Sequence, residues 1–112
     1  MDAIFKALAD ETRRSILDQL AERGGLSVGA LEQGVRAARA QGAPDLSRFA
    51  IMKHIKVLES AGLVVSRKQG RFRLHYLNAV PLQQVMDRWI EPFTQKPMVR
   101  AVLDLKARLE GE

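Results

Sequence analysis

Apolar residues recur every three or four positions through most of this chain of 112 residues, a spacing that predicts amphipathic helices. Asp10, Ser27 and Ser47 each precede such a run and are expected N-caps, because a side-chain oxygen there accepts from a free amide of the first turn. Gly62 follows one run at the point where a helix end favours a left-handed residue. The pattern predicts helices over residues 1–9, 11–23, 28–40, 47–61, 81–91 and 98–109.

Residues 63–77 follow a different pattern, which predicts two strands over 63–67 and 72–77. Gly70 lies in the connection between them and supplies the turn conformation. A two-stranded hairpin is marginal alone, so it must pack against the helices. We therefore expect a mainly α fold with a small β-hairpin, a winged helix-turn-helix in which residues 27–61 form the helix-turn-helix and residues 63–77 form the wing.

The helix over residues 47–61 has two different faces. Ile51, Ile55 and Leu58 form one apolar stripe, whereas basic and large apolar residues lie on the other side. A helix fits the major groove of DNA, where arginine and lysine contact guanine edges or phosphates and apolar groups contact thymine methyls. The expected contacts from this helix are Ser47, Arg48, Phe49, Met52, Lys53 and Lys56.

Two other interpretations of this face remain open. A basic helix face can simply be solvated, although the large apolar side chain of Phe49 argues against that. A protein partner would suit Phe49 as well as DNA does. His54 falls toward the apolar stripe, so we expect a packed or hydrogen-bonded histidine there.

Charge is concentrated in the same stretch. The chain has 18 Lys and Arg against 13 Asp and Glu, a net charge of +5, which favours polyanion partners. Between Arg48 and Arg73 there are seven Lys and Arg and only one acid, Glu59. The expected wing contacts with DNA are Arg67, Lys68, Arg71 and Arg73, and alternation predicts that Arg71 and Arg73 share one strand face. These charges also protect the hairpin edge from aggregation, a role compatible with DNA binding.

The composition excludes several kinds of site. The chain has no cysteine, which rules out disulfides, thiolate catalysis and cysteine-ligated metals. His54 and His75 are its only histidines and make a weak ligand set, so we expect no metal and no other cofactor. No glycine-rich phosphate loop or catalytic triad is evident, so we do not expect an enzyme. No apolar run suggests a signal peptide or membrane span, and we expect a cytoplasmic protein without a membrane partner.

Three stretches are similar to ArsR/SmtB-type (arsenical-repressor family) winged-helix regulators: LADETRRSILDQL, SRFAIMKHIKVLESAGLVVSRKQGRFRLHYL and LNAVPLQQVMDRWI. The resemblance covers about residues 3–90. It implies a homodimeric DNA-binding repressor whose dimer forms through the first and last helices, over residues 1–9 and 81–110. It also implies base contacts at Arg48, Phe49, Met52 and Lys53 and backbone contacts on the wing.

The chain departs from this family in two places. Ser27 and Gly29 stand where classic metal-sensing members carry Cys-Val-Cys, and the last helices contain Asp87 and Asp104 but no histidine. The resemblance therefore implies no regulatory metal in the usual sites. Residues 34–45 are an insertion that adds Arg36 and Arg39, either as phosphate contacts or as a longer, solvated helix end.

The length predicts a single domain over residues 1–112. The apolar residues of the last helices exceed what a monomer of this size with a wing would hide, which favours a symmetric dimer. Trp89 is expected in the core or in this interface rather than beside a ligand pocket. The expected interface residues are Ile4, Phe5, Leu8, Met86, Trp89, Ile90, Val99, Val102 and Leu103.

The preferred hypothesis from sequence is a sequence-specific, dimeric repressor that binds an inverted repeat in double-stranded DNA. The alternative is a winged-helix protein-interaction module without sequence-specific DNA binding. The sequence leaves open whether an inducer exists.

Overall fold

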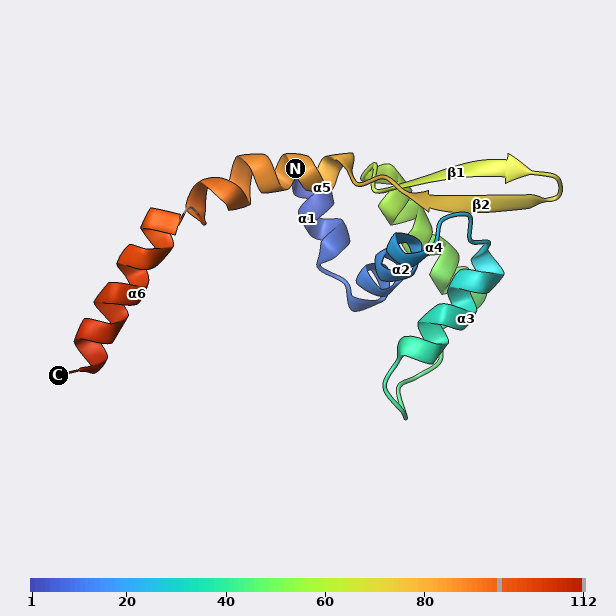
Figure 1. The fold of residues 1–112 in the computed structure, drawn as a ribbon. Coiled ribbons are helices and arrows are strands. Elements are labelled where there is room, and N and C mark those ends of the chain that lie inside the picture. Colours follow the sequence, from blue (N-terminus) through green and yellow to red (C-terminus); the bar gives the residue numbers. More distant parts are fainter. Residues whose placement is uncertain (95, 112) are drawn as a thin grey trace. The chain divides into compact units, whose positions relative to one another are not determined.

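A computed structural model describes residues 1–94 and 96–111, and it divides the chain into two compact units (Figure 1). The N-terminal unit is Met1–Pro81 and the C-terminal unit is Leu82–Glu112. The single domain expected over residues 1–112 stays a prediction. The elements are α1 (Asp2–Leu8), α2 (Glu11–Glu22), α3 (Val28–Ala38), α4 (Arg48–Ser60), β1 (Val64–Gln69), β2 (Phe72–Leu77), α5 (Val80–Val85) and α6 (Lys96–Glu110).

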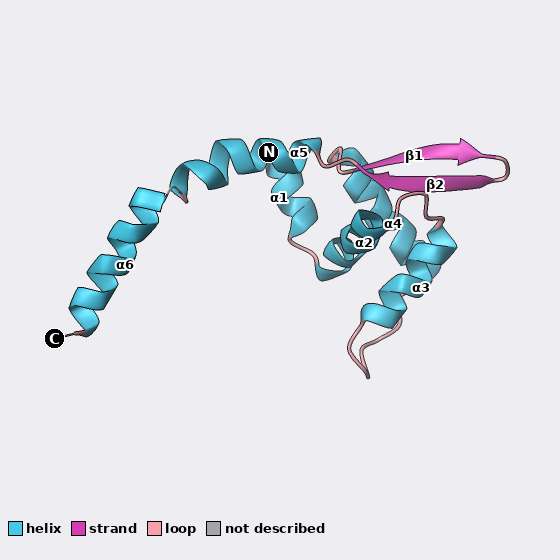
Figure 2. Cartoon of the chain, in the orientation of Figure 1, coloured by secondary structure: helices cyan, strands magenta, loops and turns pink. Residues whose placement is uncertain are grey.

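The fold is mainly α with one antiparallel hairpin, and it is a winged helix-turn-helix, as the sequence predicts (Figure 2). The three predicted N-caps are confirmed. The side chain of Asp10 accepts from the Arg13 amide at 3.0 Å, and Ser27 and Ser47 accept from the amides three residues ahead of them. These bonds satisfy amides that a helix start otherwise leaves free.

Gly62 ends α4 as predicted, with a φ of 79°. The Gly62 amide donates to the carbonyl of Glu59, and the Leu63 amide donates to the carbonyl of Leu58, both at 2.9 Å. This pair of bonds is the Schellman arrangement, which requires a left-handed residue after the helix. Leu58 and Leu63 are both fully buried, so the turn also anchors the start of the hairpin in the core.

The core of the N-terminal unit lies between α2, α3, α4 and the base of the hairpin. The predicted apolar stripe of α4 is confirmed, because Ile51, Ile55 and Leu58 are all at most 3% exposed. The other large core side chains of this unit are Ile4, Ile16, Leu17, Leu20, Leu31, Val35, Leu63 and Val64. Burial of one stripe leaves the opposite face of α4 in solvent.

The end of α3 differs from the prediction. The helix stops at Ala38, and Arg39 is extended with a ψ of 150°, whereas the sequence pattern continues to residue 40. Alanines on both sides of Arg39 favour a longer helix by local propensity. The chain must nevertheless turn back to reach the Ser47 cap, and Gly42 makes that turn with a φ of 86°. The path that the chain must take to α4 therefore overrides the local helix propensity at Arg39.

The hairpin pairs Val64 with Leu77 at its base and Gln69 with Phe72 at its tip. Its second strand matches the prediction, but β1 runs two residues further than predicted, to Gln69. The loop is therefore only Gly70 and Arg71. Gly70 has a φ of 64°, as the first position of a tight two-residue turn requires. The amide of His75 donates to the carbonyl of Leu26 at 2.9 Å. This bond links the hairpin to the segment between α2 and α3.

The C-terminal unit is less regular than predicted. After α5, a π-helical turn covers Met86–Ile90 and a 3₁₀ turn covers Glu91–Phe93. The last helix begins at Lys96, two residues before the predicted start, so Pro97 lies in its first turn. Proline is tolerated there because first-turn amides have no intrahelical partner.

We expect Gly62→Ala to lower the free energy of unfolding by about 1 kcal/mol, the cost of holding an L-residue in the left-handed region. A Cβ at this position would meet only Pro81 Cγ at 3.7 Å, so the cost comes from the backbone and not from a clash. Urea unfolding measures it. Gly62→Asn is the matched control and should lose less, because asparagine enters this region more readily. Equal stability of the wild type and the alanine variant would contradict the assignment.

Candidate nucleic-acid interface

The outer face of α4 carries large apolar and basic side chains together. Phe49 is 67% exposed and Met52 is 43% exposed, while Lys53 and Lys56 also lie in solvent. Ser47 caps the helix start through the Ala50 amide at 3.1 Å and remains exposed. The predicted contact residues of the helix therefore share an accessible surface, which continues from the N-terminus of α4 along its length.

Phe49 and Lys53 lie one helical turn apart and contact each other. The Lys53 ammonium is 4.7 Å from the centroid of the Phe49 ring. This is cation–π geometry, which an exposed site supports with about 0.5–1 kcal/mol. The aromatic ring thus has a partner within its own helix, and the ammonium is held near the outer face.

Arg48 does not project freely into solvent. Its Nε donates to Oε2 of Glu32 on α3 at 2.7 Å, although its side chain is still 64% exposed. Glu32 also pairs with Arg36 through Oε1 at 2.8 Å. The hydrogen bond from Arg48 is the main cause that holds the pKa of Glu32 below its ordinary value; burial opposes it, and the charges of Arg48 and Arg36 reinforce it.

Glu32 was not predicted from sequence. Its pairing with Arg36 could have been found, because residues four apart on a helix are neighbours. Its pairing with Arg48 crosses the loop between α3 and α4, and no local pattern marks it. Arg36, from the insertion, is thereby partly committed to a carboxylate.

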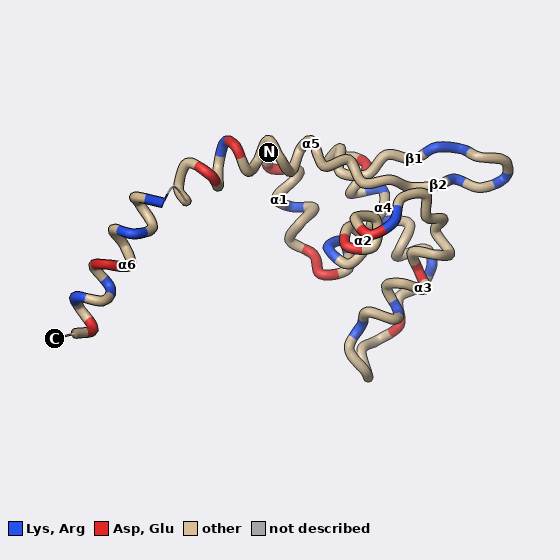
Figure 3. The backbone as a smooth tube through the Cα atoms, viewed as in Figure 1, with Lys and Arg blue, Asp and Glu red and all other residues tan. Residues whose placement is uncertain are grey.

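The hairpin presents its cations in a different arrangement from the one expected. Arg71 lies in the turn and not on β2, so it does not share a strand face with Arg73. Arg73 instead lies opposite Lys68 on the neighbouring strand, and its Nη1 donates to Ser66 at 3.0 Å. Figure 3 shows Lys and Arg gathered toward the far end of the hairpin. Like charges directly opposite each other destabilise a hairpin, and a bound anion would relieve that repulsion.

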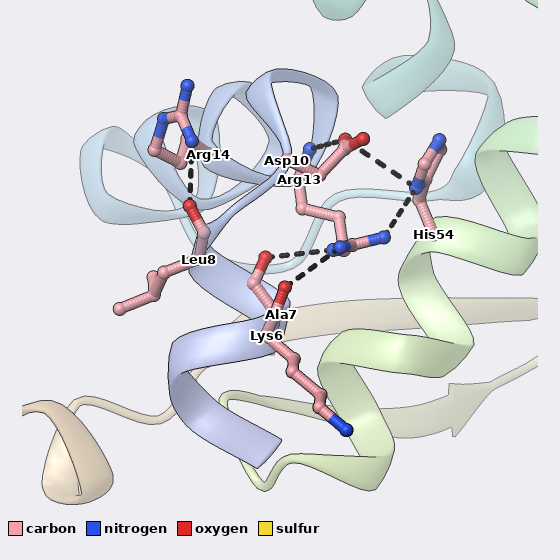
Figure 4. Close-up of polar contacts among 7 residues, drawn as sticks. All are labelled: Lys6, Ala7, Leu8, Asp10, Arg13, Arg14 and His54. Atoms are coloured by element: carbon pink, nitrogen blue, oxygen red, sulfur yellow. Dashed lines mark hydrogen bonds and ion pairs between the residues drawn. The ribbon is translucent and has the colours of Figure 1, made fainter. Parts of the chain in front are cut away.

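A polar cluster holds the inner side of α4 (Figure 4). Arg13 donates from Nε to the carbonyl of Ala7 at 2.8 Å and from Nη2 to that of Lys6 at 2.9 Å. Its Nη1 lies 3.3 Å from Nδ1 of His54, a ring nitrogen that accepts this bond when the imidazole is neutral. His54 is partly buried and hydrogen-bonded, as predicted.

Asp10 completes this cluster, with Oδ2 3.7 Å from Nδ1 of His54. Burial is the largest single influence on the Asp10 carboxyl and raises its pKa. The Arg13 amide and the charges of His54 and Arg13 outweigh burial and leave the pKa below its ordinary value of 3.8. The N-cap of α2 is therefore also an electrostatic contact to α4.

The expected dimer residues fall into two groups by exposure. Ile4 is buried, with 8% exposure, so it has little area left to offer a partner, and Leu8 is half-buried. Seven others are exposed by 41% or more: Phe5, Met86, Trp89, Ile90, Val99, Val102 and Leu103. Trp89 is therefore outside the core of the structure. One contact of its ring is with the Arg88 guanidinium, which lies 4.5 Å from the ring centroid.

The described residues also bear on metal sites and membrane spans. Across residues 1–94 and 96–111, no three His, Asp or Glu side chains gather in a way that could hold a metal ion. Within the same residues, no helix has the length and apolar character needed to cross a membrane.

Known proteins resemble this chain over most of its length. A family model described as a helix-turn-helix domain matches residues 8–67. YuzN, an uncharacterized HTH-type transcriptional regulator of Bacillus subtilis, is 48% identical over 92 residues, which cover 80% of this chain and 95% of the relative. The transcriptional repressor SdpR of the same species is 29% identical over 96 residues, covering 86% and 94% of the two chains.

A solved structure agrees with these relatives. The ArsR-like transcriptional regulator from Rhodococcus sp. RHA1 is 31% identical and superposes with a TM-score of 0.65. The match covers 99% of this chain and 91% of that one. The helix-turn-helix and its wing are therefore shared with a transcriptional regulator.

We expect Asp10→Asn to remove stability at neutral pH and the difference from wild type to shrink as pH falls. The folded-state pKa of Asp10 is lowered, so its contribution is present above the unfolded pKa and is lost as pH falls through the folded pKa. Urea unfolding between about pH 6 and pH 3 measures this difference. Asparagine still caps a helix, whereas Asp10→Ala removes both the cap and the charge and should cost more at every pH. A difference that stays constant with pH would contradict the electrostatic role of Asp10.

Proposed function

Because the chain belongs to the ArsR-type family of winged helix-turn-helix transcriptional regulators, we propose that it is a repressor that binds specific duplex DNA through α4 and the hairpin. The observation that carries the proposal is the outer face of α4, which places exposed Phe49 and Met52 among cations directly opposite a buried stripe. A helix of this kind enters the major groove with its polar face and keeps its apolar face in the protein.

The residues divide by the contacts that they would make. Arg48 would read a guanine edge, while Phe49 and Met52 would contact thymine methyl groups. Lys53 and Lys56 would contact phosphates at the groove margin, and the Ser47 end of the helix would approach the backbone with its amides. Sequence information would therefore come mainly from the first turns of α4.

The hairpin would act as a clamp on the backbone. Its cations are Arg67, Lys68, Arg71 and Arg73, all exposed. Lys68 and Arg73 repel each other in the free protein because they are cross-strand partners. Contact with phosphates would remove that repulsion and release counterions, so binding should weaken steeply as salt rises.

A homodimer would present two such DNA-binding surfaces, one from each protomer. In α6, Val102 and Leu103 are 62% and 59% exposed, and Leu105 and Leu109 are exposed to a similar degree. Apolar side chains spaced three and four apart on an exposed helix need a partner surface. A two-fold dimer would read an inverted repeat with half-site centres about 34–36 Å apart.

The alternative is a protein-interaction module, which the 67% exposure of Phe49 favours. In that case Phe49 and Met52 would form a protein-binding patch, and the cations would only keep it soluble. We propose no catalytic role for the chain and a location in the cytoplasm, where a regulator of this family meets DNA. We assign no inducer.

Selection from a random duplex library should enrich an inverted repeat, and binding to it should fall steeply with salt. We expect Lys53→Ala to weaken binding to all duplexes and to lower the salt slope by about one. Arg48→Ala should in addition reduce base discrimination at one position, roughly tenfold. Titrations with the selected duplex and its single-base variants measure both effects.

The matched control is Arg100→Ala, which removes a cation from the polar side of α6 and should leave DNA binding unchanged. Failure to enrich any sequence with folded protein would refute the proposed repressor. Capture of a protein that persists at high salt and requires Phe49 but not the hairpin cations would favour the interaction module instead.

The dimer has its own test. We expect Val102→Glu to shift the protein from dimer to monomer, because a carboxylate would be buried without a partner in the proposed interface. Sedimentation at micromolar concentration measures the change. Arg100→Glu introduces the same carboxylate on the polar side of α6, two residues from Val102, and should leave the dimer intact. A wild-type monomer under these conditions would remove both the dimer and the inverted repeat.

A further inference from the structure

Glu32 is a buried carboxylate that lies on α3 and holds the first residue of α4. Its residue exposure is 7%, and both of its oxygens are engaged. Oε2 accepts from Nε of Arg48 at 2.7 Å, and Oε1 pairs with Nη2 of Arg36 at 2.8 Å. The carboxylate therefore fixes one side of the Arg48 guanidinium and has its second oxygen neutralised by another arginine.

The hold on Arg48 leaves a defined part of its guanidinium free. Nε is committed to Glu32, whereas the side chain remains 64% exposed. Among the described residues, the bond to Glu32 is the hydrogen bond that the Arg48 side chain makes. The end formed by Nη1 and Nη2 still offers two parallel donors, the arrangement that matches O6 and N7 of guanine.

Gly29 contributes room for this arrangement. A Cβ at Gly29 would lie 3.4 Å from Nη2 of Arg48, closer than most such contacts. The guanidinium thus rests beside the first turn of α3, between a glycine and a buried carboxylate. Both neighbours come from the helix that precedes the reading helix.

We propose that Glu32 is a positioning residue for base recognition, which holds Arg48 through Nε so that its Nη1–Nη2 end addresses one guanine. This inference rests on the proposed function. An unrestrained arginine loses rotamer freedom when it binds, and a restraint already present in the free protein reduces that loss. The same carboxylate repels phosphates, so it favours discrimination at the expense of non-specific affinity.

The ionisation of Glu32 agrees with this role. The Arg48 hydrogen bond lowers its pKa in spite of burial, so the carboxylate is charged at neutral pH. A purely structural tie between α3 and α4 would use the same contact, so the test must measure base discrimination and not affinity or stability alone.

The experiment uses the chain of residues 1–112 and the duplex that wild type selects from a random library. Affinities are measured for this duplex, for each single-base-pair variant and for an unrelated duplex of equal length. We expect Glu32→Ala to lose roughly tenfold discrimination at the base pair that Arg48→Ala also affects. Affinity for the unrelated duplex should stay equal or rise. Glu32→Gln should fall between, because its amide oxygen still accepts from Nε.

Arg36→Ala is the matched control, since it breaks the other half of the network and leaves the Glu32–Arg48 bond in place. It should keep the wild-type discrimination. In an Arg48→Ala background, Glu32→Ala should cause no further loss, because the residue that it positions is gone. Circular dichroism and thermal unfolding show whether each variant is folded.

Unchanged discrimination in folded Glu32→Ala would overturn the inference, as would additive losses in the double variant. Tighter binding to the selected duplex with wild-type discrimination would assign Glu32 the opposite role, that of withholding Arg48. If Glu32→Ala does not fold, Glu32→Asp keeps the charge but shortens the reach, and discrimination retained by that variant overturns the inference. A wild type that selects no sequence at all refutes the proposed function, which separates the two failures.

Discussion

The position of α4 depends on the guanidinium of Arg13. A helix of seven residues such as α1 is marginal alone, and its last carbonyls lack the regular hydrogen bonds of a helix interior. Arg13 donates to two of these carbonyls, and Arg14 donates to a third, that of Leu8, at 2.7 Å. The same Arg13 group reaches His54 on α4. The Arg13 side chain therefore joins α1, α2 and the inner side of α4. These contacts explain why two arginines follow one another at the start of α2.

Because α4 is held in place through its inner side, packing against the core does not constrain the residues on its outer side. Ile51, Ile55 and Leu58 supply the burial, and His54 supplies the polar contact to α2. The outer face can then carry side chains that the core does not need, namely exposed Phe49 and Met52 together with cations. The hairpin shows the same division, because its base is bonded to Leu26 whereas its far end sets Lys68 against Arg73.

The sequence predicted those features that depend on neighbours within a few residues. The caps at Asp10, Ser27 and Ser47, the left-handed Gly62 and the second strand all follow from local chemistry, and the structure confirms them. Features that depend on distant residues were predicted less well. The helix α3 ends early because the chain must return to α4, and Glu32 meets Arg48 across a loop that no periodicity describes. The π-helical turn at Met86–Ile90 likewise has no local signal in the pattern, since its apolar spacing fits an ordinary helix.

The start of α3 links these observations. The family resemblance places metal-binding cysteines at the positions of Ser27 and Gly29, and here each position has another structural role. Ser27 caps α3 through the Ala30 amide at 3.2 Å, and Gly29 leaves the space that the Arg48 guanidinium occupies. A larger side chain at Gly29 would press on Arg48, and loss of the Ser27 oxygen would uncap the helix that carries Glu32. In this chain, the segment that the resemblance connects with metal sensing therefore helps to position the first residue of α4.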